Sequence, residues 1–238
     1  MKLDDKTIFV TGSNRGIGKA LVEALLKHPV RKIYAAARQP QDLPAFNDSR
    51  VVPIKLDIGD PIQIQQAVTQ AQDIDMLINN AGVLSYAGVV SGESDLLKQD
   101  MEVNYFGTLN LSRSFVPVFE KQGGGAIVNL LSVLSLASMA SVAGYSASKA
   151  ALFSATQAMR TELKAKNISV HGVFPGPIDT GMAKGLEMPK TSAQVTAENI
   201  VAGIIADQED IFPDPFSLQV SELWAKNPKA LERQFAGM

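Results

Sequence analysis

A tyrosine and a lysine four residues apart could together transfer a proton. Tyr145 and Lys149 stand in the segment Tyr-Ser-Ala-Ser-Lys, which opens a run whose apolar residues recur at helical spacing. Residues four apart share one face of a helix. A tyrosine has a pKa of about 10 and is a poor base at neutral pH, but a nearby ammonium stabilises its phenolate. The pair predicts general acid–base chemistry; a core tyrosine beside a solvated lysine is the alternative.

A glycine-rich segment near the N-terminus could hold a phosphate group. It follows the β-rich run 7–11 and precedes apolar residues at helical spacing. Glycines let the backbone approach a pyrophosphate closely, and the N-terminus of the following helix attracts its negative charge. A plain turn is the alternative, because the glycine spacing differs from the commoner dinucleotide pattern. The residues that we expect to bind a dinucleotide are Gly12, Ser13, Asn14, Arg15, Gly16, Ile17 and Gly18.

Two arginines indicate which dinucleotide would bind. An NAD-binding fold usually places an acid at the end of its second strand, where it holds the ribose 2′-hydroxyl. Here Arg38 follows the second apolar run, and Arg15 stands in the glycine loop. Two guanidinium groups without a competing carboxylate suit a 2′-phosphate. We therefore predict NADP (NADPH/NADP+) as the cofactor; two solvated surface arginines are the alternative.

The elements that must position these residues alternate between strands and helices. Such alternation predicts an α/β fold: a single Rossmann-like doubly wound parallel β-sheet, flanked by helices on both faces, with strand order 3-2-1-4-5-6. Pro53 lies in the third strand and cannot donate a ladder hydrogen bond, so this strand should lie at the sheet edge. The predicted strands span residues 7–11, 32–37, 51–56, 75–79, 126–131 and 168–174.

The pattern is less regular toward the C-terminus. It weakens after about residue 180, and the proline-rich segment 210–215 allows at most a short edge strand. Earlier in the chain, Asp60 before Pro61 predicts the start of a helix. We expect one NAD(P)-binding domain over residues 1–238, with approximately 184–238 as a substrate lid and C-terminal extension.

The composition argues against several classes of function. The chain has 238 residues, 46% of them hydrophobic, a net charge of −2 and no long run of one sign. It lacks the basic surface that nucleic acids require, and no segment reaches the roughly 18 apolar residues of a membrane span. Zero cysteines and two histidines argue against a metal site and a Ser-His-Asp triad. We expect a cytoplasmic protein with no metal and no nucleic-acid or membrane partner.

Seven motifs follow one another along the chain, each at the end of a predicted strand or on the adjoining helix. They are Thr11-Gly12 to Gly18, Asp57, Asn79-Asn80-Ala81-Gly82, Asn104 in Val-Asn-Tyr-Phe-Gly, Ser132, Tyr145 with Lys149, and Pro175-Gly176. Their joint occurrence is specific, and together they resemble the motifs of the short-chain dehydrogenase/reductase family over nearly the whole chain. The resemblance implies an oxidoreductase that transfers a hydride between NADP(H) and a carbonyl or secondary alcohol.

The resemblance also implies catalytic roles for four residues. Tyr145 would donate a proton to the carbonyl oxygen or remove one from the alcohol. Ser132 would hydrogen-bond the same oxygen, with Ser135 as the alternative. Lys149 would lower the pKa of the tyrosine and hold the nicotinamide ribose. Asn104 would anchor a water that links Lys149 to solvent; a local capping or helix-kink asparagine is the alternative.

The remaining cofactor contacts implied by the family follow the ends of the strands. Asp57 would contact the adenine, Asn79 and Ala81 the adenosine ribose, and Ile178 and Thr180 the nicotinamide carboxamide. Beyond the glycine loop, the expected cofactor set is Arg38, Asp57, Ile58, Asn79, Asn80, Ala81, Gly82, Tyr145, Lys149, Pro175, Gly176, Ile178 and Thr180.

The chain departs from the family pattern near the substrate and at its C-terminus. Leu131 replaces the first of two usual serines, Ser135 replaces a glycine, and His171 replaces an asparagine and is interpreted as structural. Segment 211–215 replaces the usual glycine-rich strand, which puts the usual oligomer contact in doubt. Apolar side chains expected near the nicotinamide predict a hydrophobic ketone or aldehyde as substrate, with 184–188 as a lid. They are Leu84, Val133, Leu134, Met139 and Met182; the alternative is that several are core residues.

The sequence also bears on the oligomeric state and on two alternative functions. Small side chains on the helix that carries Tyr145 favour close helix pairing, so we expect a homodimer or homotetramer and a mass above one chain in light scattering. A catalytically silent NADP(H)-binding regulator is the alternative function, but such proteins often lose the tyrosine or the lysine. A nucleotide-sugar epimerase or dehydratase tends to be longer.

Overall fold

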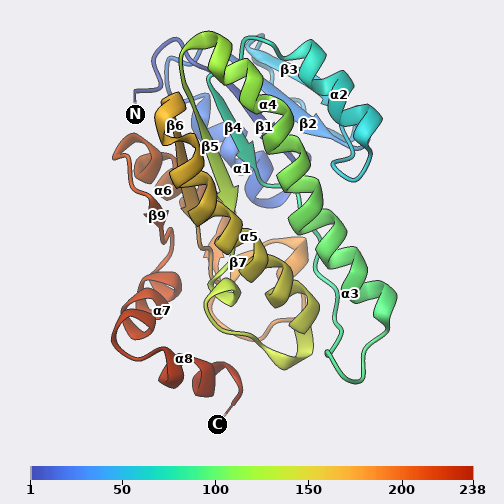
Figure 1. The fold of residues 1–238 in the computed structure, drawn as a ribbon, viewed down its shortest axis with the longest axis vertical. Coiled ribbons are helices and arrows are strands. Elements are labelled where there is room, and N and C mark those ends of the chain that lie inside the picture. Colours follow the sequence, from blue (N-terminus) through green and yellow to red (C-terminus); the bar gives the residue numbers. More distant parts are fainter. Residues whose placement is uncertain (1, 238) are drawn as a thin grey trace.

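The computed structural model describes residues 2–237 and forms a three-layer α/β fold (Figure 1). Its main strands are β1 (Thr7–Thr11), β2 (Lys32–Ala37), β3 (Val51–Lys55), β4 (Met76–Asn79), β5 (Gly125–Leu130), β6 (Ile168–Val173) and β9 (Asp210–Ile211). They form one parallel sheet in the order β3-β2-β1-β4-β5-β6-β9. The predicted order is confirmed, and the short strand β9 pairs with β6 at one edge. Pro53 lies in β3 at the other edge.

Helices and a short second sheet complete the fold. A π-helical segment, Glu102–Gly107, joins two of the helices, and β7 (Ile178–Asp179) pairs with β8 (Thr191–Ser192). The helices are α1 (Gly16–Leu25), α2 (Pro61–Gln70), α3 (Ser94–Met101), α4 (Thr108–Gln122), α5 (Ala143–Leu163), α6 (Ala193–Ile205), α7 (Pro215–Lys226) and α8 (Pro228–Phe235).

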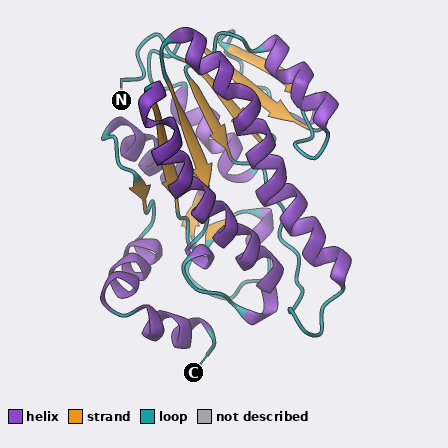
Figure 2. Cartoon of the chain, viewed as in Figure 1, coloured by secondary structure: helices purple, strands orange, loops and turns teal. Residues whose placement is uncertain are grey.

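The helices cover both faces of the sheet (Figure 2). On one face, α1 and α6 pack over Ile8 and Val10 of β1. On the other face, α2, α4 and α5 pack over Phe9. Because successive side chains of a strand point to opposite faces, one continuous apolar run supplies both buried layers.

The C-terminal region is more helical than the sequence predicts. Apolar residues occur on almost every side of α6, so its pattern lacks the contrast that marks an amphipathic helix. The helix nevertheless packs against α1 as part of one layer. Further on, α7 attaches to α5 through Trp224, whose ring lies 6.2 Å from that of Phe153. Within residues 2–237, no helix is long and apolar enough to cross a membrane.

Candidate active site

The end of β5 and the start of α5 bring Ser132 and Tyr145 together. Ser132 begins a short 3₁₀ turn, and its Oγ accepts a hydrogen bond from Leu134 N at 3.1 Å. The same side chain lies close enough to the Tyr145 phenol to lower its pKa. Ser135 instead accepts a bond from Ser132 N at 3.2 Å and so closes the turn. Of the two candidate serines, Ser132 is therefore the one that contacts the tyrosine.

Lys149 lies one helical turn after Tyr145 on α5. Its Nζ donates a hydrogen bond to Leu130 O at 2.6 Å and lies 5.8 Å from the centroid of the Tyr145 ring. Only 8% of Tyr145 and 4% of Lys149 is exposed. The phenol and the ammonium therefore share one buried environment at the carboxyl end of β5.

The sequence predicts that Lys149 lowers the pKa of Tyr145, but in the folded chain the net shift of this pKa is upward, because burial has the largest effect. Burial raises the pKa of Tyr145 to about 12; Ser132 opposes this rise and buried Asp100 adds to it. Burial lowers the pKa of Lys149 to about 8, against the attraction of Asp100. Removal from water penalises the charged form of each group. At neutral pH the phenol is therefore protonated and can act as a proton donor.

Asn104 is fully buried in the π-helical segment. Its Oδ1 accepts a bond from Val83 N at 2.8 Å, and its Nδ2 donates to Val83 O and to Ser148 Oγ, each at 2.9 Å. The side chain thus ties the loop after β4 to α5, immediately beside Lys149. Because both amide hydrogens are used here, the predicted water would have to donate to an oxygen of Asn104, and this role stays a prediction.

The glycine loop after β1 has the shape of a phosphate cradle. Gly12 and Gly16 have φ values of 66° and 55°, which glycine adopts without strain. A Cβ at Gly18 would overlap the carbonyl oxygen of Gly12, so α1 begins directly against the loop. Asn80 Nδ2 braces the loop by donating to Thr11 O at 2.8 Å and to Gly12 O at 3.1 Å. This geometry fits a dinucleotide pyrophosphate at the N-terminus of α1.

Two predicted cofactor residues have side chains that are used inside the fold. Ser13 Oγ donates to Val10 O at 2.8 Å. Asn79 Nδ2 donates to Ser112 Oγ at 2.9 Å and to Asn129 Oδ1 at 2.8 Å. These side chains are buried and bonded, so a cofactor would contact only their backbone.

The predicted adenosine end lies at the carboxyl ends of β1, β2 and β3, which are neighbours in the sheet. Arg15 and Arg38 are exposed there. Asp57 is half-buried, and its Oδ1 accepts a bond from Gly59 N at 2.9 Å. Ile58 is buried and lies against Gly107 at the end of the π-helical segment. The two guanidinium groups are therefore free to meet a phosphate on this edge.

The segment after β6 crosses toward the glycine loop. A Cβ at Gly16 would lie 3.3 Å from Thr180 Cγ2, so Thr180 faces the loop directly. At the start of the segment, Gly176 N donates to Asp214 Oδ2 at 2.8 Å. Sequence reasoning missed Asp214, although Asp214 before Pro215 repeats the signal that marks α2; Asp60 caps that helix as predicted.

A second missed residue is Asp100 on α3. Its side chain is fully buried beside the acid–base pair, and Ser85 donates two hydrogen bonds to it. Nothing in the polar sequence of α3 signals burial, because the contact depends on how α3 packs against α5.

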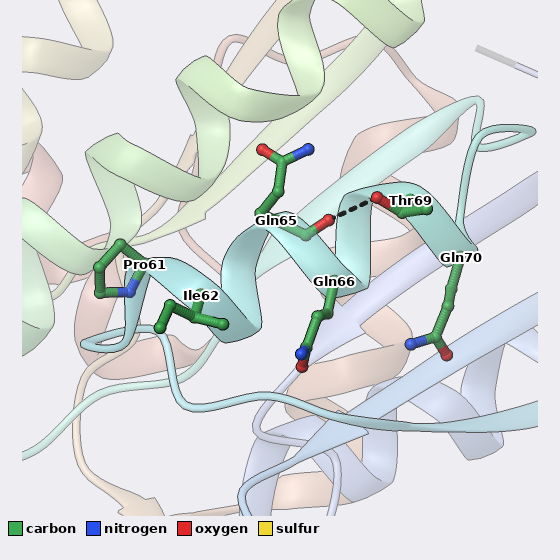
Figure 3. Close-up of a pocket in the computed structure, with 6 residues that line it drawn as sticks. All are labelled: Pro61, Ile62, Gln65, Gln66, Thr69 and Gln70. Carbon is green, nitrogen blue, oxygen red and sulfur yellow. Dashed lines mark hydrogen bonds between the residues drawn. The ribbon is translucent and has the colours of Figure 1, made fainter.

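A surface pocket elsewhere offers no comparable chemistry. Figure 3 shows its lining along α2, which covers the edge of the sheet near β3. The lining residues are Pro61, Ile62, Gln65, Gln66, Thr69 and Gln70, none of which titrates. The acid–base groups lie instead at the end of β5.

A doubly wound sheet that places a glycine cradle and a buried serine–tyrosine–lysine set at its carboxyl edge defines a dinucleotide-dependent enzyme with an acid–base centre. The chain belongs to the short chain dehydrogenase family, whose model matches residues 6–190. Members of this family are oxidoreductases that act on CH–OH and C=O groups.

Individual proteins show how far the likeness extends. A crystal structure of a short chain dehydrogenase from Burkholderia cenocepacia, in complex with NADP, is 36% identical with a TM-score of 0.93 and covers 99% of both chains. The NADP-dependent 3-hydroxy acid dehydrogenase of Schizosaccharomyces pombe is 30% identical over 86% of this chain and 87% of its own length. The dehydrogenase/reductase SDR family protein 7-like of Drosophila melanogaster is 32% identical over 76% of this chain, which covers 60% of the fly protein.

Proposed function

We propose that this chain is an NADPH-dependent reductase of hydrophobic ketones or aldehydes. The observation that carries the proposal is a buried Tyr145 phenol that lies beside Ser132 and shares its environment with Lys149, and burial raises its pKa so that it is neutral at pH 7. A neutral phenol is a proton donor, and this favours the direction from carbonyl to alcohol.

The residues divide the work as follows. NADPH, when bound, supplies the hydride that adds to the carbonyl carbon. Ser132 hydrogen-bonds the carbonyl oxygen and orients it, and Tyr145 gives its proton to that oxygen as the C=O bond is reduced. Lys149 stabilises the phenolate that remains, until the tyrosine is reprotonated from solvent.

The experiment that tests this function follows the absorbance of NADPH with a panel of carbonyl compounds. Aliphatic and aromatic ketones and aldehydes should be reduced, and sugars and charged keto acids should react more slowly. The reason is the apolar side chains near the site: Leu84, Leu134 and Met139 are half-buried, and Met182 is 44% exposed. Val133 packs with Val220 and Leu231 in a core cluster, and Leu134 packs against the same cluster with part of its surface, so Val133 is a core residue and Leu134 is one in part. A preference for sugars or charged acids would reject the substrate class.

The cofactor preference depends on the two exposed arginines. Replacing Arg15 and Arg38 together by alanine should reduce kcat/KM for NADPH about 10²- to 10⁴-fold, because each of the two charge-assisted bonds contributes about 1.5–3 kcal/mol. The value for NADH, which lacks the 2′-phosphate, should change little. Arg233→Ala, an exposed change on α8, is the matched control. Faster turnover with NADH than with NADPH in the unmodified protein would refute the preference. The NADP named for the Burkholderia and Schizosaccharomyces proteins supports it.

A further inference from the structure

A buried carboxyl group lies beside the acid–base pair without a part in the chemistry above. Asp100 is 0% exposed. Its Oδ1 accepts hydrogen bonds from the N and Oγ of Ser85 at 3.1 and 3.0 Å, whereas Oδ2 has no hydrogen-bond partner among residues 2–237. Oδ2 faces α5 at Gly144, where a Cβ would lie only 3.0 Å away. Tyr145 is the next residue on that helix.

Asn104, four residues after Asp100, connects the loop after β4 to α5 with an uncharged amide side chain. It ties the loop after β4 to α5 through Val83 and Ser148, and both of its amide hydrogens are bonded. Asp100 also holds this loop, through Ser85, but it places an ionisable group out of contact with water. Burying a charge is costly, and an amide could make the same loop contact. The charge therefore requires a separate explanation.

The charge of Asp100 affects the pKa of two titratable groups on α5, Lys149 and Tyr145. Asp100 raises the pKa of both. Burial raises the pKa of Asp100 itself, while the Ser85 bonds and the Lys149 charge lower it. Among the other titratable groups on α3, the loop after β4 and the π-helical segment, Tyr105 is half-buried and the rest are exposed to solvent. The exposed groups are Tyr86, Glu93, Asp95, Lys98 and Glu102.

We propose that Asp100 is a positioning residue: its buried carboxylate anchors the loop after β4 against α5 and supplies the negative charge that balances the buried ammonium of Lys149. The proposal rests on the reductase function, because a protonated Lys149 is what stabilises the phenolate of Tyr145 after proton transfer. With Asp100 in place the pKa of Lys149 is about 8, and burial alone would lower it further. The carboxylate extends the working range of the ammonium toward higher pH.

Asp100→Asn tests the charge without changing the shape, since an amide oxygen can still accept both Ser85 bonds. The titration of Lys149 would be followed by NMR of isotope-labelled lysine, with Lys149→Met to assign the signal. The midpoint should move down by about one pH unit, and the alkaline limb of kcat should move with it, so that the rate at pH 8 falls about fivefold. Asp95→Asn removes one charge from the same helix at a 92% exposed side chain and should change neither.

The two readouts separate the inference from the function on which it rests. An unchanged Lys149 midpoint in folded Asp100→Asn would overturn the role of Asp100, even if the enzyme is active. A shifted midpoint in a protein that reduces no carbonyl would support the link to Lys149 and overturn the reductase function instead. If circular dichroism shows that Asp100→Asn does not fold, Asp100→Ser removes the same charge with a smaller side chain, and the same two outcomes apply.

Discussion

Replacing Tyr145 with phenylalanine is expected to lower kcat about 10²- to 10⁴-fold, the usual contribution of a positioned general acid. The change removes one hydroxyl and leaves the ring in its buried place on α5. The carbonyl oxygen would then receive no proton as the hydride arrives. Binding of NADPH should change little, because the glycine loop, Asn80 and Lys149 are untouched. Steady-state rates and a fluorescence titration with NADPH measure the two effects separately.

Tyr105→Phe is the matched control for this variant. Tyr105 lies on the π-helical segment with its ring 4.9 Å from that of Phe106, and its hydroxyl has no role in the proposed chemistry. It should retain near-normal turnover. Equal rates for Tyr145→Phe and the unmodified enzyme would remove Tyr145 from the mechanism, as would a loss confined to NADPH affinity.

Replacing Lys149 with methionine is expected to reduce kcat by about 100-fold or more without lowering the free energy of unfolding. The activity falls because no cation remains to stabilise the phenolate. The fold tolerates the change because burial holds the pKa of Lys149 at about 8, against 10.5 in water. At about 1.4 kcal/mol per pKa unit, the buried cation costs roughly 3 kcal/mol at neutral pH. Loss of the bond to Leu130 O offsets about 1 kcal/mol of that gain.

The pH dependence of the free energy of unfolding is a second test of the predicted cost of burying Lys149. Between pH 8 and 10.5 the unfolded chain holds the lysine proton that the folded chain has released. The contribution of Lys149 to stability therefore rises with pH in this window and is lost as pH falls through it. Urea unfolding should show that Lys149→Met lacks this rise. A variant that is less stable than the original at neutral pH and still fully active would contradict both the burial cost and the catalytic role.

Local rules of chain geometry were sufficient to predict the sheet. The apolar runs correspond to strands within about one residue at most ends, and Pro53 correctly indicates an edge strand because its nitrogen has no hydrogen to donate. The cap at Asp60 follows from the same kind of local chemistry. Helix α6 was missed because periodicity predicts a helix only where polar and apolar faces contrast.

Only part of the site could be predicted, because local spacing places some of its residues and long-range packing places the others. The spacing of Tyr145 and Lys149 follows from helix geometry alone, and the pattern of glycines predicts the loop. The direction of the Tyr145 pKa shift could not be predicted, because it depends on how much water the folded chain excludes. Contacts such as Gly176 with Asp214 arise where distant segments pack together, which no local pattern encodes.

The most direct test of the reductase proposal uses NADPH that carries deuterium at the transferable position, together with the best ketone of the panel. The proposal predicts an alcohol with one deuterium on its carbinol carbon from the unmodified protein, and almost no labelled alcohol from Tyr145→Phe under the same conditions. An alcohol without deuterium, or equal labelled product from both proteins, would contradict hydride transfer assisted by Tyr145.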